Sequence, residues 1–200
     1  GMTAKYLIER SAGILCECDL ASEFRYRHPV VRENDLCVVI SQSGETADTL
    51  AALREAKSRG AHTVSIVNVV ESTIARESDD VIYTVAGPEI AVATTKAFSA
   101  QLAAVYLLAL RLSSAVGRID EKEEKRHCDA LLRLPEQIEQ VLENEELFKP
   151  VAERFSKASS IFFIGRGLDY SISLEGSLKL KEISYICLLY TSPSPRDMRR

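Results

Sequence analysis

An apolar run that ends abruptly at a polar, glycine-containing turn constrains the fold of this chain more than any other feature. Residues 36–40 read LCVVI, which is typical of a strand buried on both faces. The turn SQSGET follows at residues 41–46, and residues 45–59 then carry the apolar spacing of a helix. Residues 63–67 and 81–84 are predicted as further strands. Strand, helix and strand at this spacing predict a right-handed parallel crossover, so the first half is expected to be α/β.

The remaining segments predict mostly helices. Residues 3–14 have helical apolar spacing, and residues 15–18 are predicted as a short strand. Residues 94–112 form the longest predicted helix, and because they are apolar almost all round we expect them to be central in the fold. The charge run EKEEKR at residues 121–126 predicts the solvated face of a connecting helix. A further helix is expected from Pro135 to about residue 147.

A second strand, loop and helix pattern begins near residue 151. Residues 160–164 predict a strand, Gly165-Arg166-Gly167 follows, and the next segment has helical apolar spacing. Residues 187–200 show no strand or helix period, and they are interpreted as a natural loop or a non-native addition. The predicted boundaries are therefore a first subdomain over 1–117, connecting helices over 118–150, the start of a second subdomain over 151–186, and a tail over 187–200.

Composition excludes several classes of protein. The net charge of −4 gives no electrostatic reason to expect a nucleic-acid partner. Five cysteines are an odd count without zinc-ligand spacing, so we expect reduced thiols, no metal and no cofactor. No signal-peptide pattern opens the chain, and its longest apolar stretch, residues 102–110, is too short to span a membrane. A soluble cytoplasmic protein with no membrane partner is the expectation.

The SQSGET turn has two interpretations. Ligands of open parallel sheets bind beyond the carboxyl ends of the strands, and free N–H groups at a helix N-terminus favour phosphate. The hydroxyls of Ser41, Ser43 and Thr46 and the amide of Gln42 add uncharged hydrogen-bonding groups. The alternative is an ordinary helix cap, with Ser43 as the N-cap residue. The turn lacks the lysine of a Walker loop and the GxGxxG spacing, so nucleotide binding is not favoured.

Two other segments are candidate sites. Glu175, Lys179 and Glu182 fall on one helix face, where a carboxylate beside an ammonium group suits proton transfer next to a carbonyl. The same spacing is also that of an ordinary surface ion pair. The loop of small residues over 87–96 would let a ligand approach the backbone, or it simply caps the helix that follows. The three histidines are scattered along the chain and are predicted to be surface or structural residues: His28, His62 and His127.

Three stretches together closely resemble the sugar isomerase (SIS) domains of the glutamine–fructose-6-phosphate aminotransferase family, also called glucosamine-6-phosphate synthases. They are VISQSGETADTLAALREAKSRGAHTVSIVN, AGPEIAVATTKAFSAQLAAVYLLAL and FFIGRGLDYSISLEGSLKLKEISYI. The segment ASEFRYRHPV is also similar to that family. The resemblance covers nearly all of residues 3–186. It implies three layers, a parallel sheet flanked by helices, with one nearly complete SIS subdomain and the start of a second.

The resemblance also implies a function and site residues. The family converts fructose 6-phosphate and glutamine to glucosamine 6-phosphate and glutamate. By match, the substrate-binding residues are Ser41, Gln42, Ser43, Thr46, Val92 and Ala93. Glu182 matches the base that moves a proton between C1 and C2 of the sugar, Lys179 assists, and Glu175 matches a third residue of that face. The family forms homodimers and carries a glutaminase domain that this chain is expected to lack, so the chain is expected to be an inactive fragment by itself.

Two other functions stay open. A sugar-phosphate-binding SIS module without catalytic activity would use the same turn. A related isomerase or deglycase would act on another amino-sugar phosphate. The LKLKE segment, which contains the matched base, favours an enzyme over a binding module.

Overall fold

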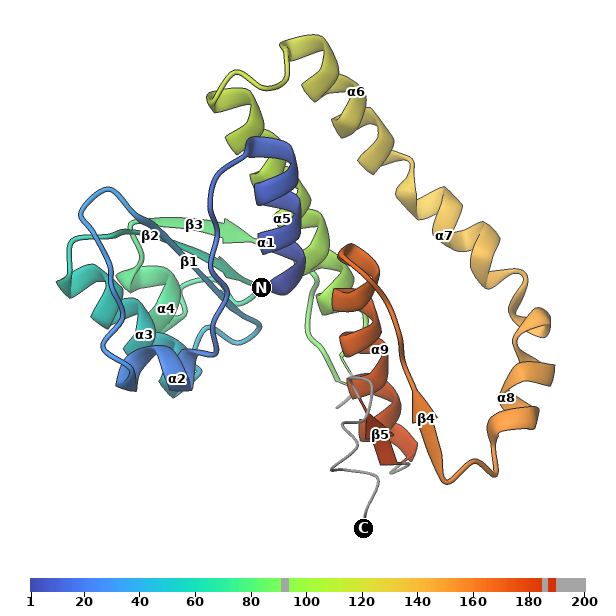
Figure 1. Ribbon diagram of the computed structural model, residues 1–200. Coiled ribbons are helices and arrows are strands. Elements are labelled where there is room, and N and C mark those ends of the chain that lie inside the picture. The colour runs from blue at the N-terminus through green and yellow to red at the C-terminus, as the bar shows by residue number, and fades with distance from the viewer. Residues whose placement is uncertain (91–93, 185–186, 190–200) are drawn as a thin grey trace. The chain divides into compact units, whose positions relative to one another are not determined.

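The computed structural model describes residues 1–90, 94–184 and 187–189. The chain forms two compact units, the first of Gly1–Lys5 with Ile14–Leu108 and the second of Tyr6–Gly13 with Ala109–Arg200. The boundary between them falls within two helices, α1 (Met2–Ala12) and α5 (Lys96–Ala115). Each unit has its own parallel strand pairing (Figure 1).

The first unit is built on a parallel sheet, which confirms the predicted α/β class. Its strands lie in the order β1 (Leu36–Ser41), β2 (His62–Val67) and β3 (Asp80–Tyr83). Helix α3 (Ala47–Ser58) connects β1 to β2, and α4 (Thr73–Glu77) connects β2 to β3. Because the strands are parallel, their carboxyl ends share one edge of the sheet, and the residues that follow them meet there.

A hydrophobic core between the sheet and its helices fixes the end of β1 and the start of α3. It contains Val39 of β1, Leu53 of α3, Val67 of β2 and Ile74 of α4. Leu53, Val67 and Ile74 are fully buried. Each such side chain stabilises the fold by about 1.5–3 kcal/mol relative to an exposed position. The core therefore holds the SQSGET turn between two anchored elements.

β1 is an edge strand of the described sheet, so the prediction that residues 36–40 are buried on both faces is wrong. Leu36 is 42% exposed, and within β1 only Val39 and Ser41 are buried. The more buried strand is β2, in which His62 is exposed and every residue from Thr63 to Val67 is buried. An apolar run indicates a strand but does not fix its place in the sheet.

The segment between α1 and α2 (Ala21–Tyr26) is irregular, so the strand predicted over residues 15–18 is also wrong. Leu15 is 87% exposed and pairs with no strand of the described chain. Gly13 ends α1 with a φ of +66°, and a Cβ there would lie 2.2 Å from the Arg118 guanidinium. The chain therefore leaves α1 through a left-handed position that favours glycine.

The second unit contains a run of helices and a second pair of strands. Its elements are α6 (Glu121–Leu132), α7 (Leu134–Leu142), the 3-10 turn η1 (Glu145–Leu147), α8 (Lys149–Phe155), β4 (Ser160–Phe162), α9 (Leu168–Ser184) and β5 (Cys187–Leu189). Asp120 caps α6, since its carboxylate accepts a hydrogen bond from the Glu123 N–H at 2.7 Å. β4 and α9 confirm the predicted strand and helix. β5 pairs in parallel with β4, so the prediction that residues 187–189 have no strand character is wrong.

Helix α5 is less buried than its apolar composition predicts. Ala104, Val105 and Ala109 are buried, whereas Tyr106 is 38% and Leu107 48% exposed among the described residues. By length and composition α5 is the one helix of the described chain that would suffice to cross a membrane. The core helices of soluble proteins have the same length and composition, so this observation is weak evidence for a membrane span.

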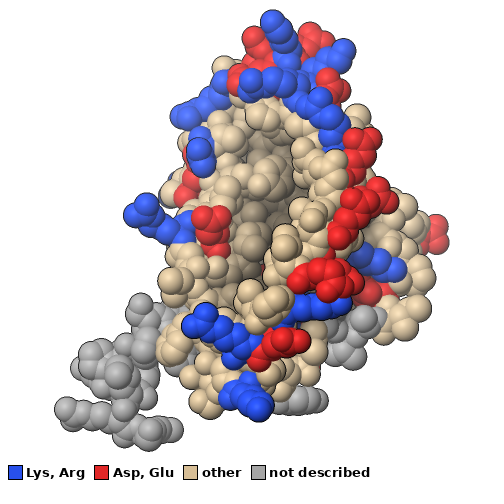
Figure 2. Space-filling model, turned by 90° about the vertical axis from the view of Figure 1, so that its right-hand side faces the viewer, with Lys and Arg blue, Asp and Glu red and all other residues tan. Residues whose placement is uncertain are grey.

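Charged side chains of both signs are interspersed on the surface. Figure 2 shows Lys and Arg beside Asp and Glu around an area of uncharged side chains on one face. Ion pairs such as Arg54 with Glu77, at 2.6 Å, follow the same pattern.

Candidate functional site

The SQSGET turn occupies the carboxyl end of β1 and leads directly into α3. Gly44 has a φ of +67°, in the left-handed region that favours glycine. The N-cap residue of α3 is Thr46, which is extended and whose side chain makes no capping hydrogen bond. The alternative that Ser43 caps the helix is therefore wrong. The first N–H groups of α3, which have no acceptor within the helix, receive no cap from the Thr46 hydroxyl.

Hydrogen bonds of the serine hydroxyls shape the turn. The buried Ser41 hydroxyl accepts from the Gly44 N–H at 3.1 Å and lies 3.0 Å from the Thr46 hydroxyl. The Ser43 hydroxyl accepts from the Glu45 N–H at 3.2 Å. Ser43 and Thr46 are exposed, whereas Ser41 is 6% exposed. Ser41 thus acts inside the turn, whereas Ser43 and Thr46 are exposed residues whose hydroxyls border it.

The first residues of α4 form hydrogen bonds with the SQSGET turn. The Ile74 N–H donates to the Gly44 carbonyl at 3.0 Å, and the Thr73 N–H donates to the Glu45 carboxylate at 2.7 Å. The hydrogen bond from the Thr73 backbone lowers the pKa of Glu45. Ser72 packs so closely that a Cβ on Gly44 would lie 2.0 Å from the Ser72 Oγ. The SQSGET backbone is therefore fixed by a second element and not only by its own residues.

The electrostatics of the turn suit an anion. The macrodipole of α3 places a positive partial charge at its N-terminus. The Asp48 carboxylate in the first helical turn would oppose an anion, but Arg25 of α2 pairs with it at 3.1 Å. The Gln42 Oε1 is buried and accepts no hydrogen bond from the described residues. Among the described residues, the turn thus combines N–H groups without a side-chain cap from Thr46, two exposed hydroxyl-bearing residues and one amide oxygen that lacks a donor.

The second candidate cluster lies on α9, where the structure brings the three predicted side chains together. The Lys179 ammonium lies 2.9 Å from the Glu182 carboxylate and 3.5 Å from that of Glu175. All three side chains are between 20% and 31% exposed. Partial burial lowers the pKa of Lys179, but the hydrogen bond to Glu182 and the two carboxylate charges outweigh it, so the pKa is raised. Lys179 is therefore a permanent cation at neutral pH, flanked by two acceptors.

The two clusters belong to different units, the turn to the first and the α9 cluster to the second. Val92 and Ala93, the other predicted binding residues, lie outside the described residues. The described part of the chain contains no group of three or more His, Cys, Asp or Glu side chains placed to hold a metal ion.

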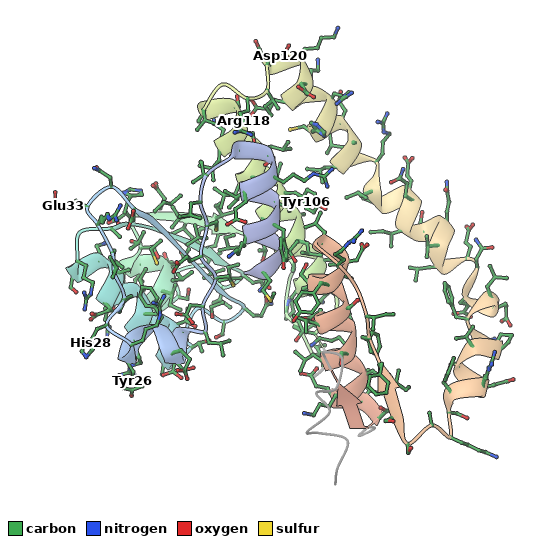
Figure 3. All side chains as sticks on the ribbon, viewed as in Figure 1. Tyr26, His28, Glu33, Tyr106, Arg118 and Asp120 are labelled. Atoms are coloured by element: carbon green, nitrogen blue, oxygen red, sulfur yellow. The ribbon has the colours of Figure 1, made fainter. Side chains whose placement is uncertain are left out.

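The histidines are surface residues where the structure shows their surroundings. Figure 3 shows His28 and Tyr26 at the outer end of α2, pointing away from the sheet. His62 at the start of β2 is not solitary, because its Nε2 lies 2.7 Å from the Asp80 carboxylate. Both observations favour the structural role predicted for these residues over a catalytic one.

Two residues near the turn have no signal in the sequence pattern. Ser72 lies 28 positions after Gly44 yet contacts it, and Asn68 follows β2 with its N–H bonded to the Gln42 carbonyl at 3.2 Å. The only available clue is position, since Asn68 is the first residue after a strand of a parallel sheet, where ligands and their supporting residues gather.

Comparisons with known proteins show the family of this chain. The SIS domain family model matches residues 1–111. Two curated relatives, from Symbiobacterium thermophilum and Clostridium tetani, are named glutamine–fructose-6-phosphate aminotransferase [isomerizing] and are 58% and 53% identical over 186 residues. The aligned region is 93% of this chain but only 30% and 31% of those relatives.

A solved structure shows the same fold. The C-terminal domain of glucosamine-fructose-6-phosphate aminotransferase from Francisella tularensis superposes with a TM-score of 0.90 at 42% identity. The match covers 94% of this chain and 53% of that chain. Since the family model matches more than half of the chain and the fold agrees, the chain belongs to the SIS domain family.

Proposed function

We propose that the chain is the sugar-isomerase part of a glutamine–fructose-6-phosphate aminotransferase and that its SQSGET turn binds the phosphate of fructose 6-phosphate. In the whole enzyme this part would convert fructose 6-phosphate, with ammonia from glutamine, to glucosamine 6-phosphate. The observation that carries the proposal is the pair of exposed hydroxyl-bearing residues, Ser43 and Thr46, at the start of α3, where the Thr46 side chain makes no capping hydrogen bond. Identities above 50% to relatives of that name support the choice of substrate.

The residues of the SQSGET turn have different roles in the proposed binding. The N–H groups at the start of α3 and the hydroxyls of Ser43 and Thr46 donate to phosphate oxygens. The Ser41 hydroxyl keeps the turn in shape through its contacts with Gly44 and Thr46. The Gln42 Oε1, which has no donor in the described chain, accepts from a sugar hydroxyl. Val92 and Ala93 would line the sugar from the loop after β3.

The α9 cluster would supply the proton chemistry. Ketose to aldose isomerisation moves a proton between C1 and C2, and the Glu182 carboxylate would take it from one carbon and return it to the other. The Lys179 ammonium, held between Glu182 and Glu175, orients the base and stabilises negative charge on the substrate oxygen. These roles require no metal and no redox step.

The whole enzyme would have further partners. Its glutaminase domain would supply the ammonia. The whole enzyme would form a homodimer and would be cytoplasmic. The 200 residues would bind the sugar phosphate without completing the reaction. Glucosamine 6-phosphate formed by this chain from fructose 6-phosphate and glutamine would contradict that part.

Calorimetric titration with fructose 6-phosphate tests the binding role. Ser43→Ala and Thr46→Ala should each weaken binding by about 5–30-fold, the loss expected when a hydrogen bond to a charged group is removed. Ser58→Ala is the matched control, because its hydroxyl bonds only to the Glu55 carbonyl at the other end of α3. Affinities of both turn variants equal to that of Ser58→Ala would contradict the phosphate role.

A further inference from the structure

Asn68 lies at the carboxyl edge of the sheet, between the turn after β1 and the loop after β3. It is the residue directly after β2, and its N–H donates to the Gln42 carbonyl at 3.2 Å. On its other side the Thr84 N–H donates to the Val67 carbonyl at 3.0 Å, which brings the end of β3 alongside. Asn68 therefore joins the phosphate turn to residues 84–87, the start of the loop after β3.

The side chain of Asn68 holds that loop through three hydrogen bonds. Its Oδ1 accepts from the Ala86 N–H at 2.7 Å and from the Thr84 hydroxyl at 3.2 Å. Its Nδ2 donates to the Gly87 carbonyl at 2.9 Å. The Ala86 N–H, which can only donate, and the Gly87 carbonyl, which can only accept, fix the orientation of the amide, since a flipped amide would place its NH₂ against the N–H and its oxygen against the carbonyl.

The residue enclosed by these contacts has a strained backbone. Val85 has a φ of +51°, a region that β-branched residues rarely occupy. Its side chain is 81% exposed, so burial of the valine does not offset the strain. The hydrogen bonds from Asn68 to the residues on either side of Val85 hold this conformation. A strained residue other than glycine that neighbouring hydrogen bonds hold in place is typical of a segment whose position serves a function.

We propose that Asn68 is a positioning residue for substrate recognition: it sets residues 84–87 after β3 relative to the phosphate turn, at the carboxyl edge of the sheet where ligands of parallel sheets bind. This inference rests on the proposed function. Asn68 itself would touch neither the phosphate nor the reacting carbons. Its removal should therefore weaken recognition of the sugar and leave the phosphate turn intact.

Titrations of the 200-residue chain followed by backbone amide NMR test the inference, because they measure weak as well as tight binding. Asn68→Ala should bind fructose 6-phosphate about tenfold more weakly while its affinity for inorganic phosphate stays within about twofold. Asn68→Asp keeps both acceptor contacts and loses the donor to Gly87, so it should fall between the wild type and Asn68→Ala. Asn144→Ala is the control, since Asn144 likewise donates to a backbone carbonyl, that of Gln140.

The outcomes separate the inference from the proposed function. Equal losses for both ligands, or no loss for either, would overturn the role of Asn68 and leave sugar-phosphate binding standing. A wild-type chain that binds neither ligand would overturn the proposed function. In that case hydrogen exchange of the backbone amides, measured without ligand, tests whether Asn68 holds the loop after β3. The Ala86 amide should exchange about tenfold faster in Asn68→Ala than in the wild type, and an unchanged rate would overturn the positioning role of Asn68.

Discussion

The hydroxyls of Ser41 and Thr46 lie 3.0 Å apart and connect the last residue of β1 to the N-cap of α3. The same Ser41 oxygen accepts from the Gly44 N–H inside the turn. A single buried hydroxyl thus links strand, turn and helix. Ser43 and Thr46, the exposed residues that the proposed function assigns to the phosphate, belong to the same hydrogen-bonded turn.

Replacement of Ser41 should destabilise the chain more than an exposed serine does. In Ser41→Ala the buried Gly44 N–H loses its acceptor, which costs about 1–3 kcal/mol of unfolding free energy. Ser58→Ala, at an exposed position, should cost less than about 0.5 kcal/mol. Urea unfolding of the two variants measures the difference, and equal midpoints with equal slopes would contradict the role given to Ser41.

Gly44→Ala should be severely destabilising for two reasons. The position has a φ of +67°, and the added Cβ would lie 2.5 Å from the Ser72 Cβ. Gly117→Ala isolates the backbone cost of roughly 1 kcal/mol, because Gly117 has a φ of +71° with nothing within 4 Å of its Cβ position. Adding Ser72→Gly to Gly44→Ala should recover part of the lost stability by chemical denaturation. If the double variant is as unstable as the sum of its single variants, Ser72 is not the obstacle.

The Asp79 carboxylate should make the stability of the first unit depend on acid pH. The hydrogen bond from Lys57, and then those from Thr63, hold the pKa of Asp79 well below its usual range. A lowered folded-state pKa means that the folded state binds fewer protons than the unfolded state, so stability is full above the unfolded pKa and falls below about pH 4.

Unfolding free energies measured from pH 7 to pH 2 test this dependence. Asp79→Asn should be less stable than the wild type at pH 7 and should lose less stability on acidification. Glu143→Gln, at the exposed end of α7, serves as the control and should follow the wild-type curve. A wild-type slope retained in Asp79→Asn would mean that other carboxylates carry the effect.

The Lys179 and Glu182 pair should contribute measurable coupling to stability. The two groups are 20% and 31% exposed, so their attraction is less screened than that of a surface pair. A double-mutant cycle with Lys179→Ala and Glu182→Ala should give about 0.5–1 kcal/mol. The exposed pair Lys149 with Glu146, at the same i,i+3 spacing, should give a smaller value. Equal couplings in both cycles would show that α9 gives its pair no special environment.

Local patterns predicted most of the strands and helices but not their burial. The apolar run before the turn predicted β1, and the spacing after it predicted α3. That β2 and not β1 is the buried strand depends on the order of strands in the sheet, which no local pattern encodes. The extended form of residues 187–189 likewise depends on pairing with β4.

The same distinction applies to the candidate site. Helical spacing alone placed Glu175, Lys179 and Glu182 on one face, and the distances confirm that proximity. The contacts of Ser72 with Gly44 and of Asn68 with the loop after β3 join residues far apart in the chain. Such contacts arise only when the strands align, so the supporting residues could not be read from sequence spacing.

The most direct test of the central claim is a map of ligand-induced amide shifts on the chain. A titration with fructose 6-phosphate, beside one with fructose, reports which amides sense the phosphate. We predict that fructose 6-phosphate produces its largest shifts at residues 43–49, the turn and first turn of α3, and that fructose leaves these amides unchanged. Equal shifts with fructose, or no shift in residues 43–49 at saturating fructose 6-phosphate, would contradict phosphate binding at the SQSGET turn.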